Sequence, residues 1–109
     1  MTDRDARIAK NESISREINE GIDEAMSSLS PEGFARMVCE CGRTDCEELV
    51  AITPAEYEDA RRDGRRFVVV KDHVIRDVEH VVAVTERYVV VEKRDGTPAD
   101  VAEASDPRD

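Results

Sequence analysis

The sequence predicts an α+β fold, with one long N-terminal helix, a small and mostly antiparallel sheet of four or five strands, and one short helix. Apolar residues recur at helical intervals over residues 4–29. Short valine-rich runs, typical of strands, follow further along the chain. Between these runs, Thr53, Pro54 and Glu56 form the capping-box pattern that marks the start of a helix.

Residues 4–29 are expected to form a single amphipathic helix. Its apolar stripe consists of Ile8, Ile14, Ile18, Ile22, Met26 and Leu29. Two uses of this stripe remain open: it covers the sheet of its own domain, or it docks on a partner protein or on a second copy of the chain. Pro31 and Gly33 then indicate a linker, so residues 1–30 are assigned to the N-terminal helix and linker.

Residues 34–93 are predicted to form the folded domain. Its helix is expected at residues 54–63, where Gly64 ends it. The unbroken apolar run over residues 67–70 favours a central, well-covered strand. The expected strands are residues 35–41, 47–53, 66–71, 78–84 and 87–93, of which the first two and the last two form hairpins. Residues 94–109 lose apolar content and are predicted to be a disordered acidic tail.

Composition limits both the core and the partners. The 109 residues carry a formal net charge of −10, and only 39% are hydrophobic, so a metal, a disulfide or a partner would help to stabilise so small a core. Without a long apolar run or a signal-like N-terminus, the sequence predicts no membrane association and a cytoplasmic protein with reduced thiols. Arg61, Arg62, Arg65 and Arg66 alternate with acids and are interpreted as a solvated helix end, so nucleic acid is not the expected partner.

The three cysteines are the strongest chemical signal, because all of them fall in the pattern Cys39-x-Cys41-x4-Cys46. Residues i and i+2 of a strand face the same side, and a turn after Cys41 can bring Cys46 back to the same point. His73, which directly follows a predicted strand, is the favoured fourth ligand, and His80 is the reserve candidate. Three thiolates and one imidazole make the closed tetrahedral set that structural Zn²⁺ uses.

A closed set of this kind predicts a non-enzymatic protein, because it leaves no coordination position for a reacting water molecule. The sequence also lacks a phosphate loop and a serine-triad signature. The predicted function is a small zinc-binding, protein-interaction or regulatory module. The alternative is a thiol-based redox or metal-responsive sensor. Another metal, a site shared between two chains, and an oxygen ligand from Asp45 or Asp72 also remain open.

Several motifs carry a resemblance to a known family. They are Val38-Cys-Glu-Cys-Gly42, Cys46-Glu-Glu, Ile52-Thr-Pro-Ala-Glu-Tyr57, His73 and Tyr88-Val-Val-Val-Glu-Lys93, preceded by Ala9-Lys-Asn-Glu and Arg16-Glu-Ile-Asn-Glu20. Through them the chain resembles a family of small uncharacterised actinobacterial proteins over about residues 6–93. The resemblance implies a shared fold and shared ligands, and it implies no activity. Separately, the cysteine spacing is similar to that of the zinc tail that follows SET-domain methyltransferases.

Overall fold

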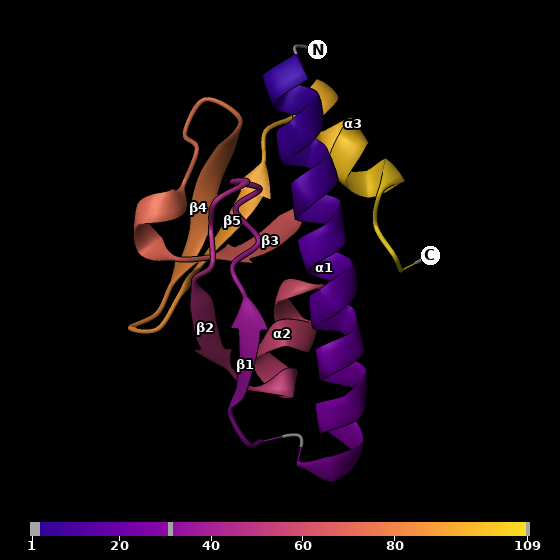
Figure 1. The fold of residues 1–109 in the computed structure, drawn as a ribbon, viewed down its shortest axis with the longest axis vertical. Coiled ribbons are helices and arrows are strands. Elements are labelled where there is room, and N and C mark those ends of the chain that lie inside the picture. Colours follow the sequence, from indigo (N-terminus) through magenta and orange to yellow (C-terminus); the bar gives the residue numbers. More distant parts are fainter. Residues whose placement is uncertain (1–2, 31, 109) are drawn as a thin grey trace.

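The computed structural model describes residues 3–30 and 32–108 of the chain. Its elements are α1 (Asp3–Leu29), β1 (Ala35–Val38), β2 (Leu49–Ile52), α2 (Pro54–Ala60), β3 (Arg66–Val69), the 3₁₀ helix η1 (Lys71–His73), β4 (Glu79–Val84), β5 (Val89–Lys93) and α3 (Thr97–Ala104). The predicted α+β class is confirmed. The 27 residues of α1 span the 41 Å long axis of the molecule, and the strands pack along one side of this helix (Figure 1).

The strands form two small antiparallel sheets, β1-β2 and β3-β5-β4, and both predicted hairpins are present. The expectation that residues 67–70 form a central strand is wrong, because β5 is central and β3 lies at an edge. The chain just after β1 covers this edge. The backbone N–H of Glu40 donates to the Val68 carbonyl at 2.8 Å, and the Glu40 carboxylate accepts from the Val68 N–H at 2.8 Å. An edge strand covered in this way can be as apolar as a central one.

The start of α2 is formed as the sequence predicts. The Thr53 side chain accepts from the Glu56 backbone N–H at 3.1 Å, and the Glu56 side chain accepts from the Thr53 N–H at 2.9 Å. Tyr57 of this helix is fully buried in the core that β1 and β2 share with α2. The capping box therefore fixes the position from which Tyr57 reaches the interior.

The buried face of α1 is polar, which corrects the prediction of an apolar stripe against the sheet. The residues that this face buries are Glu12, Arg16, Asn19 and Asp23. Ile14, Ile18 and Leu29 are instead 46%, 47% and 81% exposed, and of the predicted stripe only Ile22 and Met26 pack against the core cluster around Tyr57. Each of these four side chains has a partner on a distant segment of the chain, and such partners cannot be seen in the hydrophobic period of α1.

Residues 94–108 of the acidic tail are folded, so the prediction of a disordered tail over residues 94–109 is wrong for them, and residue 109 lies outside the described residues. Its helix α3 contributes Ala99 and Ala102 to the buried residues. Arg16 of α1 donates to the Ala102 carbonyl at 2.7 Å, and Arg108 contacts Glu20 of α1 at 2.6 Å. Basic and acidic side chains from distant segments thus stabilise a tail whose composition alone is typical of disorder.

Arg61, the first residue of the arginine cluster, is buried, whereas the sequence predicts a solvated helix end. The side chain of Arg61 is 0% exposed and forms ion pairs with Asp106 and Glu20. Arg62, in contrast, is 80% exposed. Arg65 contacts Asp95 and Glu103, and Arg66 contacts Glu92. Acids therefore neutralise this cluster. Among the described residues, no helix combines the length and apolarity that crossing a membrane requires.

Candidate metal centre

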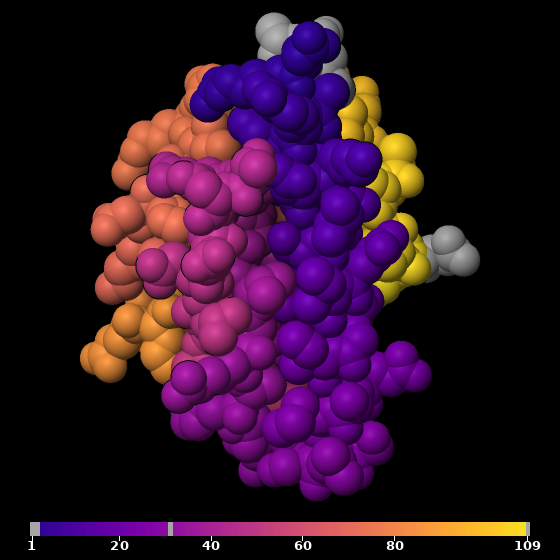
Figure 2. All heavy atoms as spheres, in the orientation of Figure 1, coloured from indigo at the N-terminus to yellow at the C-terminus, as the bar shows by residue number. Residues whose placement is uncertain are grey.

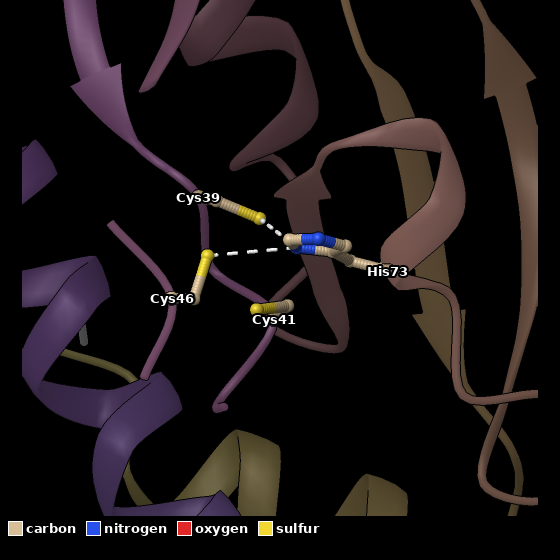
Figure 3. A group of neighbouring side chains, drawn as sticks. All are labelled: Cys39, Cys41, Cys46 and His73. Carbon is tan, nitrogen blue, oxygen red and sulfur yellow. Dashed lines mark hydrogen bonds between the residues drawn. The ribbon is translucent and has the colours of Figure 1, made fainter. Parts of the chain in front are cut away.

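The predicted ligands come from three segments that the two sheets bring together. Cys39 and Cys41 follow directly after β1, Cys46 lies in the loop before β2, and His73 is the last residue of η1, which follows β3. Figure 3 shows the three thiols and the imidazole converging on one point. β1 is shorter than predicted and ends before the cysteines, but the Cys39 N–H still bonds to the Glu48 carbonyl at 3.0 Å. This bond keeps the first cysteine in register with the hairpin.

The distances between the ligand atoms fit tetrahedral coordination. The four ligand atoms all lie within 4.8 Å of one another, and the sulfurs of Cys39 and Cys46 are each 3.5 Å from His73 Nδ1. Bonds of about 2.3 Å to sulfur and 2.0–2.1 Å to nitrogen at tetrahedral angles place those atoms about 3.5–3.6 Å apart. The group therefore matches a site that surrounds a single metal ion.

His73 is the histidine of this group, and His80 lies elsewhere. His80 stands on β4 with its side chain 45% exposed and its Nε2 atom 3.7 Å from a Glu92 oxygen. Asp45 and Asp72 do not belong to the cluster among the described residues, so the oxygen-ligand alternative gains no support. The structure thus brings together Cys39, Cys41, Cys46 and His73.

The electrostatics of the cluster favour a bound cation. The hydrogen bond from Cys39 lowers the pKa of Cys41 to about 5. The same hydrogen bond, together with burial, raises the pKa of Cys39, and burial raises the pKa of Cys46. Three crowded sulfurs on their own therefore favour one thiolate and two thiols. A divalent ion at their centre would stabilise three thiolates, because a metal deprotonates the thiols that coordinate it.

The surroundings supply backbone hydrogen bonds to the sulfurs and a fixed turn. The Val70 N–H donates to Cys39 Sγ at 3.2 Å, and Cys39 and Cys41 are only 5% and 1% exposed. Gly42 makes the turn with φ of +78°, and the Asn11 amide of α1 donates to its carbonyl at 3.1 Å. These contacts would orient the ligands of a metal, as outer-shell partners do in metal sites.

Sequence reasoning missed Glu40, which lies between the two cysteines and anchors the segment that carries them. Its carboxylate is fully buried and accepts from the Val68 N–H, the Asn19 amide at 2.8 Å and the Tyr57 hydroxyl at 2.7 Å. A signal was present, because a residue between two ligands of an extended chain faces the opposite side. The alternation Cys-Glu-Cys therefore directs Glu40 into the interior opposite the ligands.

Fold and site together define a small α+β protein with a Cys3His group suited to a metal ion. No protein-family model, no curated protein and no solved structure matches the chain. The resemblance to the family of small actinobacterial proteins stays a prediction.

Proposed function

We propose that the protein is a non-enzymatic zinc-binding module, in which Cys39, Cys41, Cys46 and His73 hold one structural Zn²⁺. The observation that carries this proposal is the pair of 3.5 Å separations between sulfur and His73 Nδ1. Zinc favours thiolate and imidazole ligands over the oxygen ligands of Mg²⁺ or Ca²⁺. Four protein ligands would complete the tetrahedral shell and leave no position for water or a substrate.

The place of the site in the fold supports a structural role. Its cysteines belong to the β1-β2 hairpin, and His73 follows β3 of the other sheet. A metal ion would therefore connect the two sheets at one end of a small core. Because such a site does not form in the unfolded chain, its binding free energy adds to the free energy of folding.

The exposed face of α1 supports a role in protein interaction. Ile14, Ile18 and Leu29 lie at helical spacing on the side that the domain does not cover. Figure 2 shows this helix lying along the surface over the length of the molecule. Apolar anchors at such spacing are the means by which one helix packs against a partner. The proposed occupant is a partner protein or a second copy of the chain.

Elemental analysis of the purified chain tests the zinc proposal. We expect one zinc per chain, and we expect His73→Ala to lose it under a competing chelator while His80→Ala retains it. The loss should exceed the roughly 10–100-fold drop in metal affinity that is typical of outer-shell substitutions. A zinc-supplemented protein that holds no zinc would overturn the proposal. Equal retention by the two variants would remove His73 from the site.

The interaction proposal has a separate test. The double variant Ile14→Glu/Ile18→Glu should abolish self-association in sedimentation experiments, or capture of a defined partner, whereas Glu17→Ala on an exposed neighbouring position should not. Because both isoleucines are about half exposed, the substitutions should leave folding intact. If the double variant associates like the wild type, α1 is not the interface, and the zinc proposal is unaffected.

One observation favours the thiol-sensor alternative. The pKa of Cys41 is lowered to about 5 by its hydrogen bond from Cys39, so the cluster would contain a thiolate at neutral pH whenever metal dissociates. A sensor would release zinc and form a disulfide at a modest dose of peroxide. A structural site would retain both its zinc and three reduced cysteines under the same treatment.

A further inference from the structure

A cavity of about 260 Å³ lies against Phe67, between the N-terminal half of α1, the loop before β4 and α3. Its apolar walls include Ile8, Ala9, Phe67 and Val101. A cavity of about 150 Å³ is sufficient to admit benzene. This cavity therefore has room for an aromatic ring or a short alkyl chain together with a polar head group.

A buried ion cluster borders the cavity. Lys93 Nζ lies 2.6 Å from Glu12 Oε2 and 2.7 Å from Glu79 Oε1, and all three side chains are at most 6% exposed. The second oxygen of Glu79 accepts from the Ile75 N–H at 3.0 Å. Among residues 3–30 and 32–108, hydrogen bonds reach Glu12 only at Oε2, and its second oxygen is not one of the fully buried atoms that lack a partner. Because Glu12 lines the cavity, a ligand can reach this acceptor.

The charges around the cavity favour a cation. When both carboxylates are ionised, Glu12, Glu79 and Lys93 together carry a net charge of −1. Arg16 lies over the Phe67 ring, 4.3 Å from its centroid, and donates to backbone carbonyls. The charged residues that line the cavity besides Glu12 and Lys93 are Arg4, Asp5 and Asp77. Lys93, the buried cation of this lining, is already paired with two carboxylates, so an anionic ligand would gain little from it.

We propose that this cavity binds a small organic amine, whose ammonium group donates to the free oxygen of Glu12 and whose apolar body packs against Phe67, Ile8 and Val101. Glu79, Lys93 and Glu12 form a row of alternating charges, and the ammonium group of the ligand would add a second positive charge next to Glu12. Alternating charges then balance in a site where an excess charge is costly. Burial raises the pKa of Glu12 to about 7, and an ammonium group beside it would favour the charged carboxylate.

Three ligands of nearly the same shape test this proposal on the full-length, zinc-loaded chain. They are benzylamine, benzyl alcohol and benzoate, titrated by calorimetry and by ¹H–¹⁵N correlation spectra at neutral pH. We expect benzylamine to bind at least ten times more tightly than benzyl alcohol, and benzoate not to bind. The shifted amides should cluster around Ala9, Phe67 and Val101. Equal affinity for amine and alcohol, binding of benzoate, or no binding of the amine would each overturn the proposal.

A variant pair separates charge from shape. Glu12→Gln keeps the size of the side chain and removes its charge, so the preference for amine over alcohol should fall below threefold. Val101→Phe fills the cavity and should abolish binding of both ligands. Retention of the tenfold preference in Glu12→Gln, or unchanged binding in Val101→Phe, would exclude this site. If either variant fails to fold, the three-ligand comparison on the wild type still decides the question.

Discussion

The backbone of Gly42 turns with φ of +78°, and α1 occupies the place where a side chain would be. A β-carbon at Gly42 would lie 2.8 Å from the Ile8 carbonyl oxygen and 2.8 Å from Glu12 Cγ. The backbone oxygen cannot rotate away. Glycine is therefore required here both by conformation and by the close approach of the helix.

Gly42→Ala should lower the free energy of unfolding by at least about 1–2 kcal/mol, the cost of the left-handed conformation alone. Gly21→Ala is the matched control. Gly21 lies inside α1 with nothing within 4 Å of an added β-carbon, so this change should raise the free energy of unfolding by about 0.5–1 kcal/mol. Urea denaturation of both variants measures the two effects. Effects of the same sign would contradict the prediction.

Glu12 predicts a pH dependence of stability. Burial raises its pKa from 4.5 to about 7, although Lys93 opposes the shift. The pKa of Glu12 is higher in the folded chain than in the unfolded chain. The protonated carboxyl group therefore contributes stability that is fully present below pH 4.5 and is lost as the pH rises through 7. The complete shift corresponds to about 3 kcal/mol. Glu12→Gln should therefore gain stability relative to the wild type between pH 5 and pH 8, measured by urea denaturation with metal saturating. Parallel pH curves for the two proteins would rule this out.

Among the elements, α1 is unusual because polar groups attach it to the domain. Asn19 donates to the Val38 carbonyl at 2.8 Å, accepts from the Val38 N–H at 2.9 Å and also donates to Glu40 at 2.8 Å. Its amide thus pairs with the edge of β1 in the manner of a neighbouring strand. Such a network specifies one docking position, because any displacement of the helix leaves buried groups without partners.

Asn19→Ala should lower the free energy of unfolding by at least about 2 kcal/mol, since it leaves both Val38 backbone groups and one Glu40 oxygen with fewer partners. It should also weaken zinc binding, because Cys39 directly follows Val38. Glu17→Ala, on the exposed side of the same helix, should change stability by less than about 0.5 kcal/mol. Urea denaturation and competition with a chelator measure the two effects. An Asn19→Ala protein as stable as Glu17→Ala would show that apolar contacts alone hold α1.

In the molecule as a whole, the C-terminal segment closes the structure over two buried arginines. Arg16 donates to the carbonyl of Ala102, and Arg61 pairs with Asp106.

A chain that ends after Gly96 should lose more than about 3 kcal/mol of stability, because buried cations would lose their partners. Asp100→Ala, at an exposed position of α3, should stay within about 0.5 kcal/mol of the wild type. Thermal unfolding checks both. A truncated chain with unchanged stability would restore the prediction of a disordered tail.

Local chemistry was sufficient to predict the candidate metal ligands and most of the elements. The capping box at Thr53, the two hairpins and the Cys39-x-Cys41-x4-Cys46 pattern each depend on residues that are close in sequence. His73 could also be predicted from the sequence, because few side chains can complete a metal site that already has three thiolates. Which ion binds, and which partner α1 contacts, remain proposals.

Contacts between distant segments decided the rest. Glu12 and Lys93 are separated by 81 positions, and Arg16 and Ala102 by 86. The periodicity of apolar residues gives no information on buried polar groups. It therefore led to the prediction that Ile14 and Ile18 lie on the buried side of α1, whereas both are exposed. A buried charge is stable only where folding supplies its counterpart. The polar face of α1, the ordered tail and the edge position of β3 could therefore appear only once the chain was folded.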